Sequence, residues 1–280
     1  MVNNKKMVEI NIIKASGEKA IFKKNTIEKT ALRAGASRKL AQEVANKVSK
    51  KVKEGTSTKE ILNLTLKSLK NNPVVAARYD LKRAIMMLGP SGFAFEEFFA
   101  QVLQNYGYTT KTGIELRGKM VNQEVDILAR KKLGYMIEAK YHNQIGIHTD
   151  TKVAMYTYAR FLDVKSNSKN KVDKPWLVTN TRVTGSALQY SKGVGLKVTG
   201  WAYPKNEPLQ KLIEDKALYP ITIFKGLSES VKQKLFSSKI VLAKDLANHK
   251  LKDLSRKTGL SEKKLNDILN EAKHICGNKI

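Results

Sequence analysis

Cysteine is almost absent from this sequence of 280 residues. The one cysteine, Cys276, excludes a disulfide framework and any cysteine-based zinc site. No apolar run approaches the length of a membrane span, and the N-terminus lacks the hydrophobic region of a signal peptide. We therefore expect a cytoplasmic protein with no membrane partner. Histidine is also scarce, and its four positions show no metal-ligand spacing: His142, His148, His249 and His274.

Acidic residues are few in comparison with basic ones. The chain has 25 acidic and 52 basic residues, which gives a net charge of +27, and nine of the basic residues are arginine. The excess is positive in each of the segments 1–87, 88–205 and 206–280. This distribution suits a polyanionic partner along the whole chain. A lysine-rich proteome would produce the same balance without such a partner.

The strongest local pattern lies between residues 92 and 140. Its first part has Phe95, Phe98, Phe99 and Val102 at helical spacing, which predicts an amphipathic helix. Its second part has two short alternating runs, 124–129 and 135–140, around a basic turn that ends in glycine. This arrangement predicts a β-hairpin.

The hairpin predicts a cluster of charged side chains if it folds symmetrically about Lys132. Asp126 then faces Glu138 and Glu124 faces Lys140, and all four share one side of the sheet. Two adjacent carboxylates repel each other, and a divalent cation such as magnesium resolves the conflict because it prefers oxygen ligands. A register shifted by one residue would scatter the cluster.

Asp126 followed by Glu138-Ala139-Lys140 resembles the D…(D/E)-x-K signature of the PD-(D/E)xK nucleases. The resemblance implies that Asp126 and Glu138 bind Mg²⁺ or Mn²⁺, that Lys140 is the catalytic lysine, and that Glu96 is the helix-borne acid. The Mrr-type restriction endonucleases, the branch that this chain resembles, often have Gln-x-Lys in place of Glu-x-Lys. The pieces that indicate this branch are Gly92-Phe93-x-Phe95-Glu96 and Gly107-Tyr108.

Other interpretations of these residues remain open. The alternative is that the acids are ordinary surface residues that pair with lysines on a sheet edge. Downstream, Lys152, Tyr156 and Arg160 recur at a spacing of four residues on a predicted helix from about 150 to 163. This stripe suits contact with a DNA backbone, or it is an ordinary half-exposed face. His142 suits either a general base or a structural role.

Residues 1–87 predict a small domain of one hairpin and four short helices. The order resembles the ATP-cone, a nucleotide-sensing domain, through Ile13-Lys14-x-x-Gly17, Gly55-x-x-Thr58 and 76–79. The resemblance implies that Lys14 and Thr58 contact ATP or dATP. Thr58 is expected at a helix N-terminus, where the dipole favours phosphate. Plain alternatives are a helix cap for Thr58 and a solvated strand residue for Lys14.

Residues 216–280 predict helices, and Gly-Leu-Ser-Glu occurs twice, at 226–229 and 259–262. This repetition resembles the helix-hairpin-helix modules of DNA repair proteins, in which a turn presents backbone N–H groups to phosphate. The resemblance suggests that Gly259, Ser261 and Lys263 bind DNA. The alternative is a helical bundle that packs on the nuclease or on another copy of the chain.

The predicted fold class is α/β multidomain: an ATP-cone-like domain at 1–87, a mixed-sheet nuclease domain at 92–205 and an all-α domain at 216–280. The predicted function is that of a metal-dependent endonuclease for double-stranded DNA, regulated by a nucleoside triphosphate, in restriction or in repair of branched DNA. Double-strand cleavage would favour a homodimer. The alternative is a nucleotide-sensing DNA-binding regulator with an inactive nuclease fold.

Overall fold

The computed structural model describes residues 9–89 and 92–277 and divides the chain into two compact units, the first ending at Leu81 and the second beginning at Lys82. Predictions for residues 7–8 (strand), 90–91 (linker) and 278–280 (end of the helical domain) lie outside the described residues. Within the described ranges, no helix is both long and apolar enough to cross a membrane.

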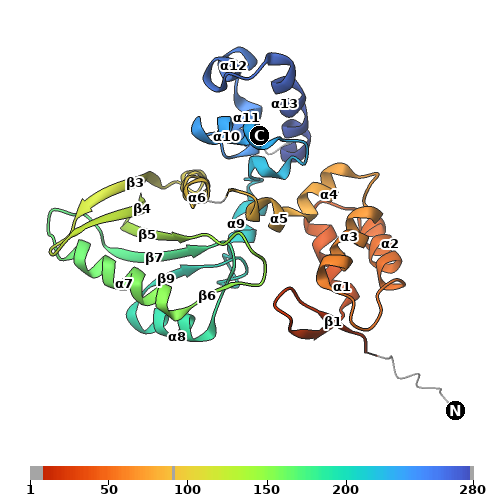
Figure 1. Cartoon of the computed structure of the whole chain (residues 1–280), viewed down its shortest axis with the longest axis horizontal. Coiled ribbons are helices and arrows are strands. Elements are labelled where there is room, and N and C mark those ends of the chain that lie inside the picture. Colours follow the sequence, from red (N-terminus) through yellow and green to blue (C-terminus); the bar gives the residue numbers. More distant parts are fainter. Residues whose placement is uncertain (1–8, 90–91, 278–280) are drawn as a thin grey trace. The chain divides into compact units, whose positions relative to one another are not determined.

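The first unit is a small hairpin followed by helices (Figure 1). Its apolar core contains Ile27, Val44, Val48 and Leu69. Val44 and Val48 lie one turn apart on the same helix and so share its buried face, while Lys39 and Lys47 of that helix are exposed. The elements are β1 (Asn11–Ile13), β2 (Lys19–Ile21), α1 (Lys24–Arg33), α2 (Arg38–Ser49), α3 (Thr58–Ser68) and α4 (Pro73–Tyr79).

Three details of this unit correct the predictions. Asn25, a residue type favoured as a helix cap, lies inside α1, which begins at Lys24. The cap of α3 is Ser57, whose hydroxyl accepts from Glu60 N–H while the Glu60 carboxylate accepts from Ser57 N–H. The expected fourth helix is interrupted at Asp80, where the backbone leaves helical geometry, and α5 (Leu81–Met86) follows.

The second unit contains a mixed five-stranded sheet in the order β3-β4-β5-β7-β9. The first three strands pair antiparallel, and β5, β7 and β9 pair parallel. A sheet of this kind with helices on both sides is a mixed α/β fold. The strands are β3 (Thr109–Arg117), β4 (Asn122–Arg130), β5 (Gly134–Lys140), β7 (Lys174–Thr179) and β9 (Lys197–Thr199).

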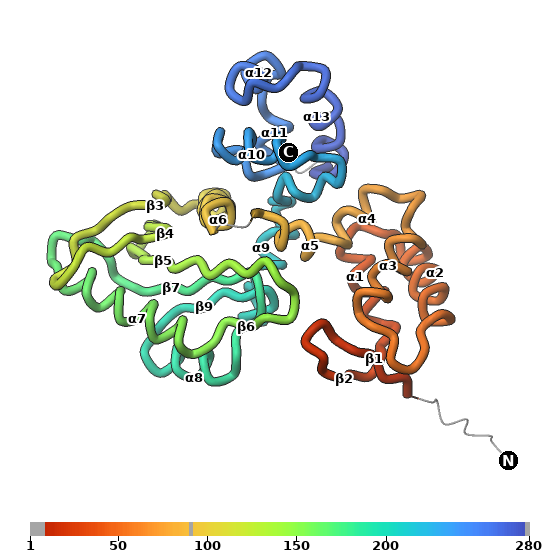
Figure 2. Tube along the Cα trace, in the orientation of Figure 1, coloured from red at the N-terminus to blue at the C-terminus, as the bar shows by residue number. Residues whose placement is uncertain are grey.

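Helices cover both faces of this sheet. Figures 1 and 2 show α6 (Phe93–Asn105) on one side, and α7 (Thr151–Lys165) and α8 (Gly185–Val194) on the other. As predicted, Phe95, Phe98 and Phe99 of α6 are fully buried. The Phe99 ring meets Trp176 of β7 edge-on at 5.6 Å between ring centroids. The helix–sheet contact therefore fixes the position of α6, which carries Glu96.

Shorter elements complete the second unit. β6 (His148–Thr149) and β8 (Arg182–Val183) form a parallel pair, and α9 (Leu209–Asp215) lies between the predicted nuclease domain and the predicted C-terminal domain. The C-terminal part is helical, as expected. It contains η1 (Ile221–Ile223), α10 (Glu229–Ser237), α11 (Ala243–Asn248), α12 (Leu251–Thr258) and α13 (Glu262–Cys276).

Candidate active site

The β4–β5 hairpin has the predicted register. Ile127 pairs with Ile137 and Arg130 with Gly134, which places the centre of symmetry at Lys132. The ladder ends at the Ile127–Ile137 pair, so Asp126 and Glu138 are not joined through their backbones, and Glu124 pairs with Glu115 of β3. At this end, the Asp126 carboxylate accepts a hydrogen bond from the Ala139 N–H at 2.7 Å.

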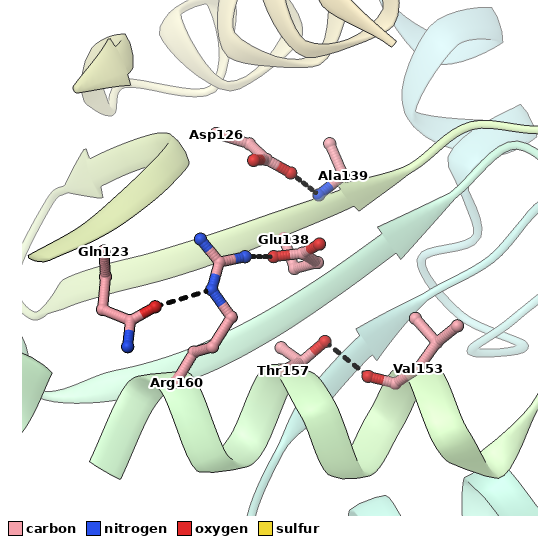
Figure 3. Close-up of polar contacts among 7 residues, drawn as sticks. All are labelled: Gln123, Asp126, Glu138, Ala139, Val153, Thr157 and Arg160. Carbon is pink, nitrogen blue, oxygen red and sulfur yellow. Dashed lines mark hydrogen bonds and ion pairs between the residues drawn. The ribbon is translucent and has the colours of Figure 1, made fainter. Parts of the chain in front are cut away.

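Glu138 is held by an arginine side chain of α7. The Arg160 guanidinium forms an ion pair with the Glu138 carboxylate and donates through Nε to Gln123 at 3.1 Å (Figure 3). The Arg160 and Glu138 side chains are 10% and 15% exposed. The pair therefore lies largely out of water, where its electrostatic interaction is stronger than on an exposed surface.

The protein raises the pKa values of both carboxyl groups. Burial and the nearby Asp126 charge raise the pKa of Glu138 to about 7, although Arg160 and Lys140 oppose the shift. Burial also raises the pKa of Asp126, against the opposing effects of the Ala139 N–H and Arg160. Mutual repulsion and desolvation are the conditions under which two acids gain most from a shared cation.

Glu96 joins this cluster from α6. Burial, and after it the charges of Asp126, Glu124 and Glu138, raise its pKa to about 7. Four carboxylates from α6, β4 and β5 thus influence one another, as the sequence predicted for Asp126, Glu138 and Glu96. Raised carboxyl pKa values of this size concentrate at functional sites.

Lys140 lies at the end of β5 and lowers the pKa of Glu138 through its charge. Beyond it, the His142 ring contacts the Thr149 hydroxyl at 3.1 Å, and Thr149 donates to Thr179 at 2.9 Å. The backbone of His142 is held by the Asn180 amide. These bonds give His142 a structural role at the edge of the site.

The donor set suits a hard divalent cation. Glu138 engages Arg160 through Oε2, and its Oε1 makes no hydrogen bond to any described residue. Asp126 supplies a second carboxylate nearby, and both are oxygen donors of the type magnesium prefers. In the described part of the chain, no three His, Cys, Asp or Glu side chains are grouped closely enough to hold a metal. Waters or a bound phosphate would have to complete the shell.

The three residues of the predicted DNA-binding stripe on α7 do not all face solvent. Lys152 and Tyr156 are exposed, whereas Arg160 turns inward to Glu138 and stacks under Tyr156 at 5.1 Å from the ring centroid. The inward position follows from the unpaired charge that Glu138 would otherwise bury. The sequence prediction missed this pairing and the role of Gln123, because only the fold brings residues 123, 138 and 160 together.

In the C-terminal helices, Gly259 ends α12 in the left-handed conformation with φ of 63°, and Ser261 precedes α13. Lys263 lies in the first turn of α13 and is exposed. A glycine is favoured at such a turn because other residues are strained there. The three residues thus lie together at one interhelical turn, as the sequence indicated.

In the first unit, Lys14 and Thr58 lie at neighbouring positions because Ile13 bridges Ser57. The Lys14 ammonium forms an ion pair with Glu18 at 3.0 Å. Thr58 is the first residue of α3 rather than its cap. The two predicted nucleotide contacts are therefore brought together, but Lys14 already has a partner.

Comparison with known proteins assigns two segments of this chain to known families. A restriction endonuclease family model matches residues 88–202, and a model described as AF1548-like, C-terminal, matches residues 219–276. An uncharacterised protein of Archaeoglobus fulgidus is 42% identical over 179 residues, which cover 64% of this chain and 99% of that protein. The crystal structure of AF1548, a protein of unknown function, has a TM-score of 0.61 and 39% identity, and the match covers 67% of this chain and 99% of that one.

Proposed function

Because this chain belongs to the AF1548-like family and has a restriction endonuclease domain at residues 88–202, we propose that it is a metal-dependent endonuclease that hydrolyses phosphodiester bonds in double-stranded DNA. The observation that carries the proposal is the group of interacting acids at Glu96, Asp126 and Glu138, with Lys140 alongside. The net charge of +27 supports a polyanionic substrate.

In this proposal each residue has a distinct role. Asp126 and Glu138 hold Mg²⁺ or Mn²⁺, which when bound polarises the scissile phosphate and lowers the pKa of an attacking water. The Lys140 ammonium stabilises the negative charge that develops on the phosphate oxygens. Glu96, with a pKa of about 7, exchanges a proton with water near neutral pH.

The Arg160–Glu138 ion pair favours the alternative, a DNA-binding regulator with an inactive nuclease fold, because it engages one of the proposed metal ligands. In the enzyme, Oε1 of Glu138 is still available to a cation while Arg160 retains Oε2. The two functions therefore differ in whether a metal ion and the Arg160 guanidinium can bind the Glu138 carboxylate at the same time.

A cleavage assay separates these functions. Supercoiled, methylated and branched DNA would be incubated with Mg²⁺ or Mn²⁺, using the wild type, Asp126→Asn and Glu138→Gln, with Glu207→Gln as a control that removes an exposed acid elsewhere. We expect cleavage by the wild type and the control, and a loss of at least about 100-fold in both site variants. Metal-dependent cleavage that survives both substitutions would reject the assignment.

We also propose that the first unit binds ATP or dATP near Lys14 and Thr58. The support is the Ile13–Ser57 bridge, which brings the two residues to the start of α3. Equilibrium dialysis with labelled nucleotide tests this directly. Binding that is equal in the wild type and in a Lys14→Ala/Thr58→Ala variant would place the nucleotide elsewhere.

The remaining proposals concern DNA contact and assembly. Lys152 and Tyr156 on α7, and Gly259, Ser261 and Lys263 at the α12–α13 turn, would contact the DNA backbone, which suits a helix-hairpin-helix role for the C-terminal part. Cleavage of both strands by one site per chain would favour a homodimer. Sedimentation of the protein with and without DNA measures that assembly.

A further inference from the structure

The nuclease unit has a cavity that is separate from the acidic cluster. It has a volume of about 420 Å³ and is lined by residues of β3, β4 and the loop 169–172 that follows α7. This volume lies within the range of sites that bind small organic ligands.

The floor of the cavity is apolar. Leu116 of β3, Leu128 of β4 and Val172 of the loop line it. All three belong to the apolar cluster that packs the sheet against α7, and Val172 is 5% exposed. The floor is therefore part of the core and is fixed in shape by it.

The rim of the cavity is cationic. Lys111, Arg130, Lys169 and Lys171 line it, and among the described residues no carboxylate does. Within the described ranges, none of the three lysines forms an ion pair. Like charges that gather without a counter-ion destabilise the folded protein, so this rim complements an anion.

The loop that closes the cavity is held in place by its own hydrogen bonds. The Asn170 side chain donates to the carbonyl oxygens of Arg117 and Val164, both at 2.9 Å. Arg130 donates to the Lys171 carbonyl oxygen and so joins β4 to the loop. Pre-formed sites of this kind lose little conformational entropy when a ligand binds.

We propose that this cavity binds a phosphorylated nucleoside. A nucleotide combines a flat ring, which suits the leucine and valine floor, with a phosphate, which suits the cationic rim. The nucleotide can be a free mononucleotide or one unit of a nucleic-acid strand. The proposal holds whether or not the acidic cluster cleaves DNA, because no residue is shared between the two sites.

A single fluorescent label can report on the cavity. The only cysteine, Cys276, is buried, so a Thr109→Cys variant can be labelled selectively at the exposed edge of the cavity. Titrations in EDTA would use deoxyadenosine monophosphate, adenosine, inorganic phosphate and a short single-stranded oligonucleotide. EDTA prevents metal-dependent cleavage from altering the oligonucleotide.

The expected result is saturable binding of the monophosphate, with adenosine and phosphate each at least about tenfold weaker. Binding of the oligonucleotide alone would assign the site to a strand-borne nucleotide and also supports the proposal. Equal binding of inorganic phosphate and the monophosphate would overturn it, because the apolar floor would then have no role. A label that responds to none of the probes would overturn it too.

Charge-matched variants test the rim. The triple variant Lys111→Ala/Lys169→Ala/Lys171→Ala is compared with Lys192→Ala/Lys205→Ala/Lys252→Ala, which removes the same charge from exposed positions elsewhere. We expect about tenfold or greater loss of binding in the first and less than about twofold in the second. Equal losses in both would assign the binding to overall charge rather than to this cavity.

Discussion

The acids of the candidate site are individually unfavourable for folding. Desolvation raises the pKa values of Glu96, Asp126 and Glu138, and repulsion from neighbouring carboxylates, including Glu124, adds to the shifts. A carboxyl whose folded pKa lies above its unfolded value lowers the free energy of unfolding as pH rises through the interval between the two. For Glu96 this interval runs from 4.5 to about 7.

We predict that Glu96→Gln stabilises the metal-free protein at pH 8 and has little effect at pH 4, where Glu96 is protonated in both states. The gain is on the order of 1 kcal/mol after allowance for solvent exposure, or a rise of a few degrees in Tm. Thermal unfolding in EDTA at the two pH values measures it. Equal changes in Tm at both pH values would contradict the burial of a charged Glu96.

Arg160 lowers the pKa of Glu138, so its removal should raise that pKa. For Arg160→Ala we predict that the pH of half-maximal cleavage moves upward by about one unit or more, because ionised Glu138 is reached only at higher pH. The pH profile of cleavage measures this shift. Tyr156→Phe keeps the ring that stacks on Arg160 and should leave the profile unchanged. An unshifted pH profile in Arg160→Ala would show that Arg160 does not control the ionisation of Glu138 on which cleavage depends.

At the scale of elements, the hairpin was predictable and its surroundings were not. Alternating side chains and a glycine turn are local features, and they were enough to predict the register of β4 and β5. The partner of Glu138 comes from α7, and the edge strand β3 pairs over a loop with no strong turn signal. Such contacts depend on tertiary packing, which a single sequence does not show.

Gly134 offers a test of the hairpin turn. A Cβ there would lie 2.3 Å from the carbonyl oxygen of Lys171, so the loop would have to move. We predict that Gly134→Ala lowers the free energy of unfolding by about 1–3 kcal/mol. Gly185→Ala is the control, because a Cβ at that helix start meets no atom within 4 Å. Urea unfolding compares the two, and equal midpoints would contradict the close packing of the turn.

At the scale of the whole molecule, the positive charge extends over both compact units. Composition alone predicted a polyanionic partner. It did not indicate which lysines lie together around the cavity. The helical character of the first and last segments was also predictable from periodicity. Their nucleotide-sensing and helix-hairpin-helix assignments stay predictions. The two family models match residues 88–202 and 219–276, and the second is described only as AF1548-like, C-terminal.

We predict a steep salt dependence of DNA binding. If six or more phosphates are neutralised, affinity should fall by about 10³-fold or more between about 50 and 200 mM salt. Fluorescence anisotropy with labelled duplex DNA in EDTA measures the slope. A slope near zero would mean that the lysine excess does not contact DNA.

Metal binding provides the most direct test of the central claim that Asp126 and Glu138 share a cation. Electron paramagnetic resonance of added Mn²⁺ can count the ions bound by the wild type, Asp126→Asn and Glu138→Gln, with Glu207→Gln as the control. We predict that a bound ion seen in the wild type and the control is lost in both site variants. Mn²⁺ binding that is undiminished in Asp126→Asn and Glu138→Gln would contradict it.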